Sequence, residues 1–136
     1  MLKVKDIMTD TLYTLHPTAS IFDAHQLMAK YKIHHLPVID DSNNLVGLLS
    51  QRDLLRASVS VFADVNKEER NEIEAGIPIK SVMSTDLVVA EQETPLEEIA
   101  QHLLNEGHGC LPVVGDDGIQ GIVTEADFVK LAITLL

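Results

Sequence analysis

The sequence has few of the residues that build disulfides or aromatic cores. Among its 136 residues there is one cysteine, Cys110, there is no tryptophan, and only 4% are aromatic. A single cysteine excludes an intrachain disulfide and fits a reducing compartment, so we expect a cytoplasmic protein. Because aromatic side chains are scarce, the core has to be aliphatic, and leucine, valine and isoleucine are abundant enough to build it.

Basic residues are scarce as well. The chain has 10 Lys and Arg against 21 Asp and Glu, a formal net charge of −11. Nucleic acids and anionic membranes bind proteins through a basic face, so this composition argues against both as partners. No apolar run approaches the roughly 18 residues of a membrane-spanning helix, and the N-terminus lacks the apolar core of a signal peptide.

The acidic excess is uneven along the chain. Residues 1–57 carry six basic and six acidic residues, residues 58–78 carry two and five, and residues 79–136 carry two and ten. The first part is therefore neutral, while the last part has a net charge of −8. A protein that is acidic overall can still bind an anion where its cations gather, and this distribution favours the first part of the chain.

The chain contains an internal repeat, in which residues 7–56 correspond to residues 82–130. Leu36-Pro37-Val38 is matched by Leu111-Pro112-Val113 in the second copy. Two copies at such a long period indicate duplication of a small domain, because a solenoid repeats every 20–50 residues.

Each repeat has the hydrophobic pattern of a β-α-β-β-α unit, which predicts an α/β fold. We expect repeat 1 over residues 1–57, an acidic insert over 58–78 and repeat 2 over 79–136. Units this small bury a limited core alone, so the two repeats are expected to pack against each other. The expected extended segments are 12–15, 36–39, 45–49, 87–90, 110–114 and 119–123, and the expected closing helices are 51–57 and 125–135.

Two further helices have recognisable starts. Asn66 precedes two glutamates, and the Gly76 and Pro78 stop signals follow, which predicts a short solvated helix over 67–75. This helix is interpreted as a spacer, with a lid or a partner surface as the alternative. In the second repeat, Thr94 followed by Pro95 predicts a helix that Thr94 caps.

The strongest pattern is Gly-apolar-apolar-Ser/Thr-x-x-Asp at each predicted strand-to-helix turn, which places Ser50 and Asp53 in one copy and Thr124 and Asp127 in the other. The glycine lets a neighbour or a ligand approach the backbone closely. The hydroxyl and the carboxylate can cap the helix. A carboxylate there can also accept from the vicinal hydroxyls of a ribose, and the first turn offers N–H groups to a phosphate.

Other reactive residues point to no catalysis and no metal. Ser50 has no base partner at a recognisable spacing, so nucleophilic catalysis has little support. The histidines match no zinc spacing, and we therefore expect no metal site. His34 and His35 lie beside two lysines and are either surface histidines or phosphate ligands. Cys110 falls in an apolar run and is expected to be a buried, inert thiol.

Together these residues resemble the tandem CBS (cystathionine-β-synthase) domain pair, or Bateman module. The resemblance rests on Asp6-Ile7-Met8-Thr9, Ile33–Asp40, Gly47–Asp53 and their second-copy equivalents, and it covers the chain except the insert. The run from Leu48 to Leu54 is similar to that of acetoin-utilisation regulatory proteins. The resemblance implies that the paired repeats leave clefts for adenine nucleotides (AMP, ADP, ATP) or S-adenosylmethionine, and that the module dimerises into a disc.

The resemblance also implies roles for individual residues. The motif aspartates would bind ribose hydroxyls and the motif hydroxyls would contact ribose or phosphate, while the pair before Leu-Pro-Val would contact phosphate and the threonine before the first long helix would lie near ribose or base. These roles carry over to Asp53, Asp127, Ser50, Thr124, His34, His35 and Thr94. Where copy one has the histidine pair and Arg52, copy two has Gly109, Cys110 and Ala126. The resemblance implies a pseudo-two-fold pair of repeats in which a single cleft draws on both copies. We therefore expect one competent site with phosphates toward His34, His35 and Arg52 of copy one, while copy two keeps ribose-binding groups.

The sequence thus predicts a non-enzymatic, homodimeric sensor of an adenine nucleotide. It requires no cofactor, since the nucleotide is its regulatory ligand, and it acts through an unknown effector protein. The alternative is a dimeric interaction or scaffold module with vestigial ligand clefts. An enzyme is the least supported class.

Overall fold

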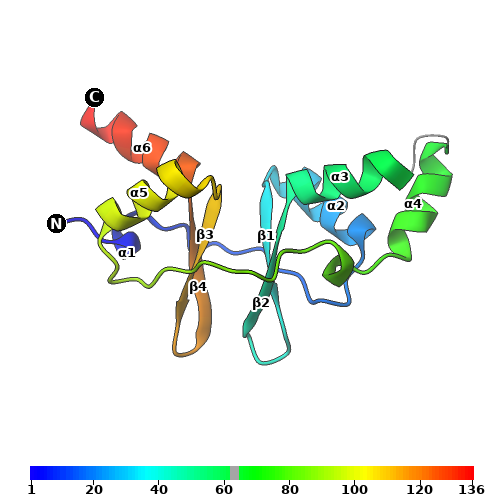
Figure 1. Ribbon diagram of the computed structural model, residues 1–136, viewed down its shortest axis with the longest axis horizontal. Coiled ribbons are helices and arrows are strands. Elements are labelled where there is room, and N and C mark those ends of the chain that lie inside the picture. The colour runs from blue at the N-terminus through cyan, green and yellow to red at the C-terminus, as the bar shows by residue number, and fades with distance from the viewer. Residues whose placement is uncertain (62–64) are drawn as a thin grey trace. The chain divides into compact units, whose positions relative to one another are not determined.

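The chain folds into two compact units whose boundaries differ from those of the sequence repeats. The computed structural model describes residues 1–61 and 65–136 (Figure 1). One unit, here called the central unit, is Tyr13–Leu87. The other combines Met1–Leu12 with Val88–Leu136 and is called the terminal unit, because it holds both ends of the chain.

The central unit is built on the antiparallel hairpin of β1 (His35–Ile39) and β2 (Leu45–Ser50). Its helices are α2 (Ile21–Tyr31), α3 (Gln51–Val61), α4 (Lys67–Ala75) and the short 3-10 helix η1 (Ile79–Ser81). Each β1 residue from Leu36 to Val38 is buried, and the apolar face of α2 packs on the hairpin. The core is aliphatic, as expected, and consists of Ile21, Ala24, Met28, Leu36, Val38, Leu49, Leu54 and Ile79.

The terminal unit repeats this arrangement with β3 (Cys110–Gly115) and β4 (Gly118–Thr124) as its hairpin. Its helices are α1 (Val4–Ile7), α5 (Leu96–Glu106) and α6 (Glu125–Leu135). The buried cluster is again aliphatic and consists of Val4, Ala90, Ile99, Leu103, Leu111, Val113 and Val123. Lys3 and Lys5 pair with Glu93 at 2.6 and 2.8 Å, and their hydrogen bonds lower the pKa of Glu93 to about 2.

Each hairpin gains a backbone partner from a distant part of the sequence. Thr9 pairs with Ile122 of β4 through two hydrogen bonds of 2.8 and 2.9 Å. Ser84 pairs with Leu48 of β2 through two bonds of 2.9 and 3.0 Å. Since Thr9 and Ser84 are equivalent positions of the two repeats, the segment that begins each repeat pairs with the hairpin of the other. This exchange explains why the compact units do not follow the repeats.

Most expected elements are confirmed, with three differences. The helix over 67–75 is confirmed, but its Glu74 is only 4% exposed, 3.6 Å from His25 Nε2. The closing helix of repeat 1 is longer than expected and runs to Val61. The extended segments 12–15 and 87–90 form single parallel bridges, at Leu15 and Ala90, and no strand of their own.

The expected cap at Thr94 is wrong. The residue before α5 is Pro95, which makes no side-chain cap, and Thr94 Oγ1 instead accepts from Glu91 N at 3.1 Å. The hydroxyl therefore closes the preceding turn, because the backbone of Thr94 is already tied to Val4 by a hydrogen bond of 2.9 Å. Tertiary pairing thus displaces the local capping preference.

The motif glycines allow the segments of Thr9 and Ser84 to cross close to the hairpin of the other repeat. The two glycines are expected to differ in how well they tolerate replacement by alanine. A Cβ at Gly121 would lie 2.8 Å from the carbonyl oxygen of Thr9, whereas a Cβ at Gly47 would meet the flexible side chain of Met83. We expect Gly121→Ala to lower the free energy of unfolding by about 1–3 kcal/mol, because backbone cannot move aside as a side chain can. Gly47→Ala is the matched control and should cost clearly less in urea denaturation. An equal loss for the two variants would contradict this account of the crossing.

Candidate functional site

The motif of the central unit is a capping box at the junction of β2 and α3. Ser50 N donates to Asp53 Oδ2 at 3.1 Å, and Asp53 N donates to Ser50 Oγ at 3.1 Å. This reciprocal pair satisfies two backbone donors at the start of the helix. Among the described residues, the hydrogen bonds to the Asp53 carboxylate reach Oδ2, so Oδ1 is available to a ligand.

The two candidate histidines lie at the same end of the central unit. His35 is paired with Ser50 in the β1–β2 ladder, and Gln51 N donates to the carbonyl of His34 at 2.8 Å. His34 is exposed and His35 is half-buried. Arg52 is exposed in the first turn of α3, next to Asp53. The structure therefore brings five of the candidate residues together, and they are named below as the His34–Asp53 cluster: His34, His35, Ser50, Arg52 and Asp53.

The motif of the terminal unit has the same local form but a different environment. Asp127 is 5% exposed, and Thr124 N donates to its Oδ2 at 2.8 Å. Thr9 Oγ1 donates to the other oxygen, Oδ1, also at 2.8 Å. The carboxylate thus accepts from the exchanged segment as well as from its own helix start, and both of its oxygens are occupied. Asp127 holds Thr9 in place in this structure.

Thr9 is the residue that sequence reasoning missed. In the sequence it is part of the run Asp6-Ile7-Met8-Thr9, whose Met8-Thr9 is matched by Met83-Ser84 in the second copy, and its hydrogen-bond partner lies 118 residues away in the chain. The available signal was that this pattern recurs at equivalent positions of both repeats, each with a hydroxyl residue. That signal marks a position but does not reveal which aspartate the hydroxyl meets.

Thr94 lies apart from the other candidates of the terminal unit. Its contacts are the turn bond from Glu91 and a backbone bond from Val4. Among the described residues, no hydrogen bond joins it to Thr124 or Asp127. The two motif pairs, Ser50 with Asp53 and Thr124 with Asp127, also belong to different compact units.

Cys110 is buried, as expected. Burial raises the pKa of its thiol to about 12, and the negative charge of Asp127 adds to the shift. Because the thiolate is the reactive form, this cysteine is inert at neutral pH.

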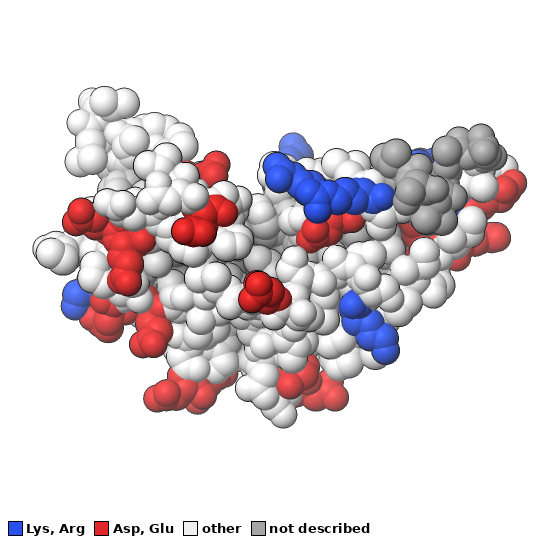
Figure 2. All heavy atoms as spheres, viewed as in Figure 1, with Lys and Arg blue, Asp and Glu red and all other residues white. Residues whose placement is uncertain are grey.

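The charges on α3, which begins at the motif of the central unit, and on α5 of the terminal unit differ in sign. Figure 2 shows Lys and Arg atoms over α3 and Asp and Glu atoms over α5 and the hairpin turns. The basic residues of α3 are Arg52 and Arg56. The acidic residues of α5 are Glu97, Glu98 and Glu106. An anionic ligand is therefore favoured near the start of α3.

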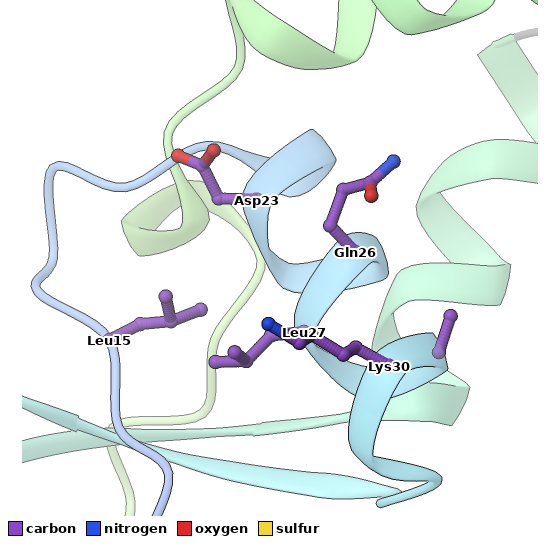
Figure 3. A pocket seen from close by; sticks show the side chains of 6 residues that line it. Leu15, Asp23, Gln26, Leu27 and Lys30 are labelled. Atoms are coloured by element: carbon purple, nitrogen blue, oxygen red, sulfur yellow. The ribbon is translucent and has the colours of Figure 1, made fainter.

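A separate cleft of about 600 Å³ lies on the outer face of α2. It is lined by Leu15, Asp23, Gln26, Leu27, Ala29 and Lys30. Leu27 and Lys30 extend from the helix toward the segment that carries Leu15 (Figure 3). The carboxylate of Asp23 is used in a capping box with Ser20. None of the candidate residues lines this cleft.

Residues 1–61 and 65–136 contain neither a group of three or more metal ligands nor a membrane-spanning helix. Within these residues, no group of three or more His, Cys, Asp and Glu side chains could hold a metal ion. Within the same part of the chain, every helix is too short or too polar to cross a membrane.

Comparison with known proteins assigns the fold. The CBS domain matches the chain twice, over residues 4–60 and 79–133. The chain belongs to the CBS domain family. The two matched segments are the two CBS repeats of a tandem pair, and the resemblance inferred from the motifs is confirmed.

Three solved structures are similar to this CBS pair. A crystal structure of an acetoin utilization protein (AcuB) from Vibrio cholerae has a TM-score of 0.83 and 38% identity, with 99% of this chain and 93% of that chain covered. CBSX2 in complex with AMP has a TM-score of 0.82 and 32% identity, with 99% and 98% covered. The CBS domain pair of protein MJ0100, in complex with 5′-methylthioadenosine and S-adenosyl-L-methionine, has a TM-score of 0.81 and 26% identity, with 100% and 99% covered.

A longer relative carries the same pair as part of its chain. The uncharacterized protein MJ1225 of Methanocaldococcus jannaschii is 30% identical over 128 residues, which is 94% of this chain and 42% of that protein. The chain therefore spans less than half the length of this relative.

The different environments of the two motif aspartates predict different costs of removal. Asp127→Ala unpairs two half-buried donors, Thr9 Oγ1 and Thr124 N, and we expect a loss of about 2–4 kcal/mol in the free energy of unfolding. Asp53→Ala removes one side of a half-exposed capping box, and we expect about 1 kcal/mol. Urea denaturation of the two variants measures the difference. Similar losses would show that the contact between Thr9 and Asp127 does not stabilise the terminal unit.

Proposed function

We propose that this CBS pair is a regulatory module that binds an adenine nucleotide and catalyses no reaction itself. Two similar structures, those of CBSX2 and MJ0100, contain AMP and two adenosyl compounds respectively. These ligands share an adenosine group, so a ribose diol and an adenine are the features that a related site would recognise. The observation that carries the proposal for this chain is the available oxygen of Asp53 beside the cations of the His34–Asp53 cluster.

The proposed contacts follow from the chemistry of each side chain. Asp53 Oδ1 can accept from a ribose hydroxyl while Oδ2 keeps its bond from Ser50 N. The Ser50 hydroxyl accepts from Asp53 N, and its own proton remains for a ribose or phosphate oxygen. Arg52 and the imidazoles of His34 and His35 supply the donors that a phosphate requires.

The terminal motif is proposed as a weaker candidate for ligand binding. A ribose is less favoured at Asp127 than at Asp53, because Asp127 is 5% exposed and each of its oxygens already accepts a hydrogen bond, Oδ1 from Thr9 Oγ1 and Oδ2 from Thr124 N. Thr94 Oγ1 accepts from Glu91 N and keeps its own proton for a ligand, but among the described residues no hydrogen bond joins Thr94 to Thr124 or Asp127. We therefore assign the first bound nucleotide to the His34–Asp53 cluster.

The experiment is calorimetric titration with AMP, ADP, ATP and S-adenosylmethionine. We expect at least one of them to bind. Asp53→Asn should weaken it tenfold or more, because an amide has one acceptor oxygen and cannot accept from both Ser50 N and a ribose hydroxyl. Asp23→Asn is the matched control: Asp23 forms the same capping box with Ser20, at 3.0 and 3.1 Å, outside the cluster. Its effect should be less than twofold.

Two outcomes would overturn the proposal. If none of the four compounds binds, the module is not an adenine-nucleotide sensor. If the Asp53 and Asp23 variants lose affinity equally, the ligand does not contact the cluster.

A second candidate function is a scaffold whose ligand sites are vestigial. Two observations favour it. Both oxygens of Asp127 already accept hydrogen bonds, and copy two has Gly109 and Cys110 in place of the histidine pair. A scaffold would bind its effector protein equally well with and without nucleotide. For a sensor, binding of the effector should change when nucleotide is added and should lose this response in Asp53→Asn.

We also propose that the module acts as a homodimer through α6. Val129 and Ile133 lie one turn apart on this helix, and their side chains are 59% and 65% exposed. Leu135 of α6, the neighbouring Leu136, and Leu104, which lies on α5, are exposed as well. Glu125 and Lys130 are the exposed charged residues among the 12 that end the chain. An exposed apolar face of this kind is typical of an interface between proteins.

The homodimer is tested by placing a charge in the apolar face. We expect Ile133→Glu to shift the protein to a monomer in sedimentation equilibrium, because a charge buried in an interface without a partner is costly. Thr134→Glu is the control, since the next residue points about 100° further round the helix. A wild-type protein that is monomeric at every concentration would exclude the homodimer. The cytoplasmic location and the effector protein stay predictions.

A further inference from the structure

Exposed apolar residues recur at equivalent positions of the two closing helices. Leu54 and Phe128 are equivalent residues of the two repeats, and both pack against the aliphatic core of their own unit. The next residue in each copy, Leu55 on α3 and Val129 on α6, is instead 54% and 59% exposed. A single exposed leucine is ordinary, but the same exposure at equivalent positions of two separately folded units indicates a surface that both units use.

The helices around these two residues differ in charge. With histidine neutral, α2 and α3 of the central unit together have a net charge of +1, whereas α5 and α6 of the terminal unit have −4. Basic atoms accordingly lie over α3 and acidic atoms over α5 in Figure 2. Two terminal units that met through these helices would therefore repel each other, while a terminal unit and a central unit would attract.

Two-fold symmetry makes such a pairing reciprocal. When α3 of one copy contacts α6 of a second copy, the same rotation brings α6 of the first copy against α3 of the second. The two contacts together cover Leu55 and Val129 in both copies. A dimer that pairs like units would cover the same residues, but it would bring the helices with −4 against each other.

We propose that two copies of this chain associate head to tail, which means that the central unit of each copy meets the terminal unit of the other. The surface around Leu55 on α3 is then covered by the surface around Val129 and Ile133 on α6 of the second copy. This inference rests on the homodimer proposed above and adds which face covers α6. It also places the nucleotide cluster and the dimer contact on one helix, because Arg52 and Asp53 lie in the first turn of α3.

The first test is sedimentation equilibrium of Leu55→Glu and of Ile133→Lys. Each should weaken dimerisation roughly tenfold or more, since the new carboxylate would face the acidic helices of the terminal unit and the new ammonium would face α3 with its two arginines. Both side chains are more than half exposed within their own unit, so neither change should disturb a core. Circular dichroism confirms that each variant is folded.

The second test mixes these two variants, with a fluorescent label on Ile133→Lys. In a head-to-tail pair of the two variants, one contact joins new charges of opposite sign and the other contact is wild type. The labelled protein should therefore return to a dimer when unlabelled Leu55→Glu is added. Leu55→Lys is the matched control: it changes only the sign of the charge at that position, and the labelled protein should stay monomeric with it.

Four results would overturn the proposal. If Leu55→Glu dimerises like the wild type while Ile133→Glu does not, the homodimer stands and α3 lies outside its interface. If labelled Ile133→Lys stays monomeric with Leu55→Glu, the copies do not meet head to tail. If it recovers equally with Leu55→Lys, the two positions do not face each other. A wild-type protein that is monomeric at every concentration would exclude the homodimer itself.

Discussion

The backbone pairing of Thr9 with Ile122, and its counterpart between Ser84 and Leu48, determines how the chain divides into units. Each pairing joins the opening segment of one repeat to the hairpin of the other. The glycines of the two motifs lie under these crossings, where a side chain at Gly121 would collide with the carbonyl of Thr9. The motif glycine is therefore required by the fold itself, for this close approach of two backbone segments, before any role in ligand binding.

The motif aspartate has a different structural role in each copy. In the terminal unit, Asp127 is buried and accepts a hydrogen bond from the hydroxyl of Thr9. It thereby holds the exchanged segment against the hairpin of the other repeat. In the central unit, Asp53 is half-buried, and among the described residues its carboxylate accepts only from Ser50 N at the start of its own helix, α3. The copy with the less occupied carboxylate is also the one with the histidine pair and Arg52, and this coincidence supports a single nucleotide site there.

The charge of −11 is divided unequally between the two compact units. The central unit has seven Lys and Arg against ten Asp and Glu, and the terminal unit has three against eleven. Lys3 and Lys5 belong to the terminal unit although they are part of repeat 1 in the sequence, and they are paired with Glu93. The remaining cations are therefore concentrated in the unit with the proposed phosphate ligands.

The sequence by itself determined the fold family, both hairpins and the position of the candidate cluster. These depend on local periodicity and on a motif repeated in register, which are properties of neighbouring residues. Only the tertiary structure decided the composition of each unit, the partner of Asp127 and the role of Thr94. Each of these depends on backbone pairing between distant segments. Spacing along the sequence does not encode the distance between such atoms in space.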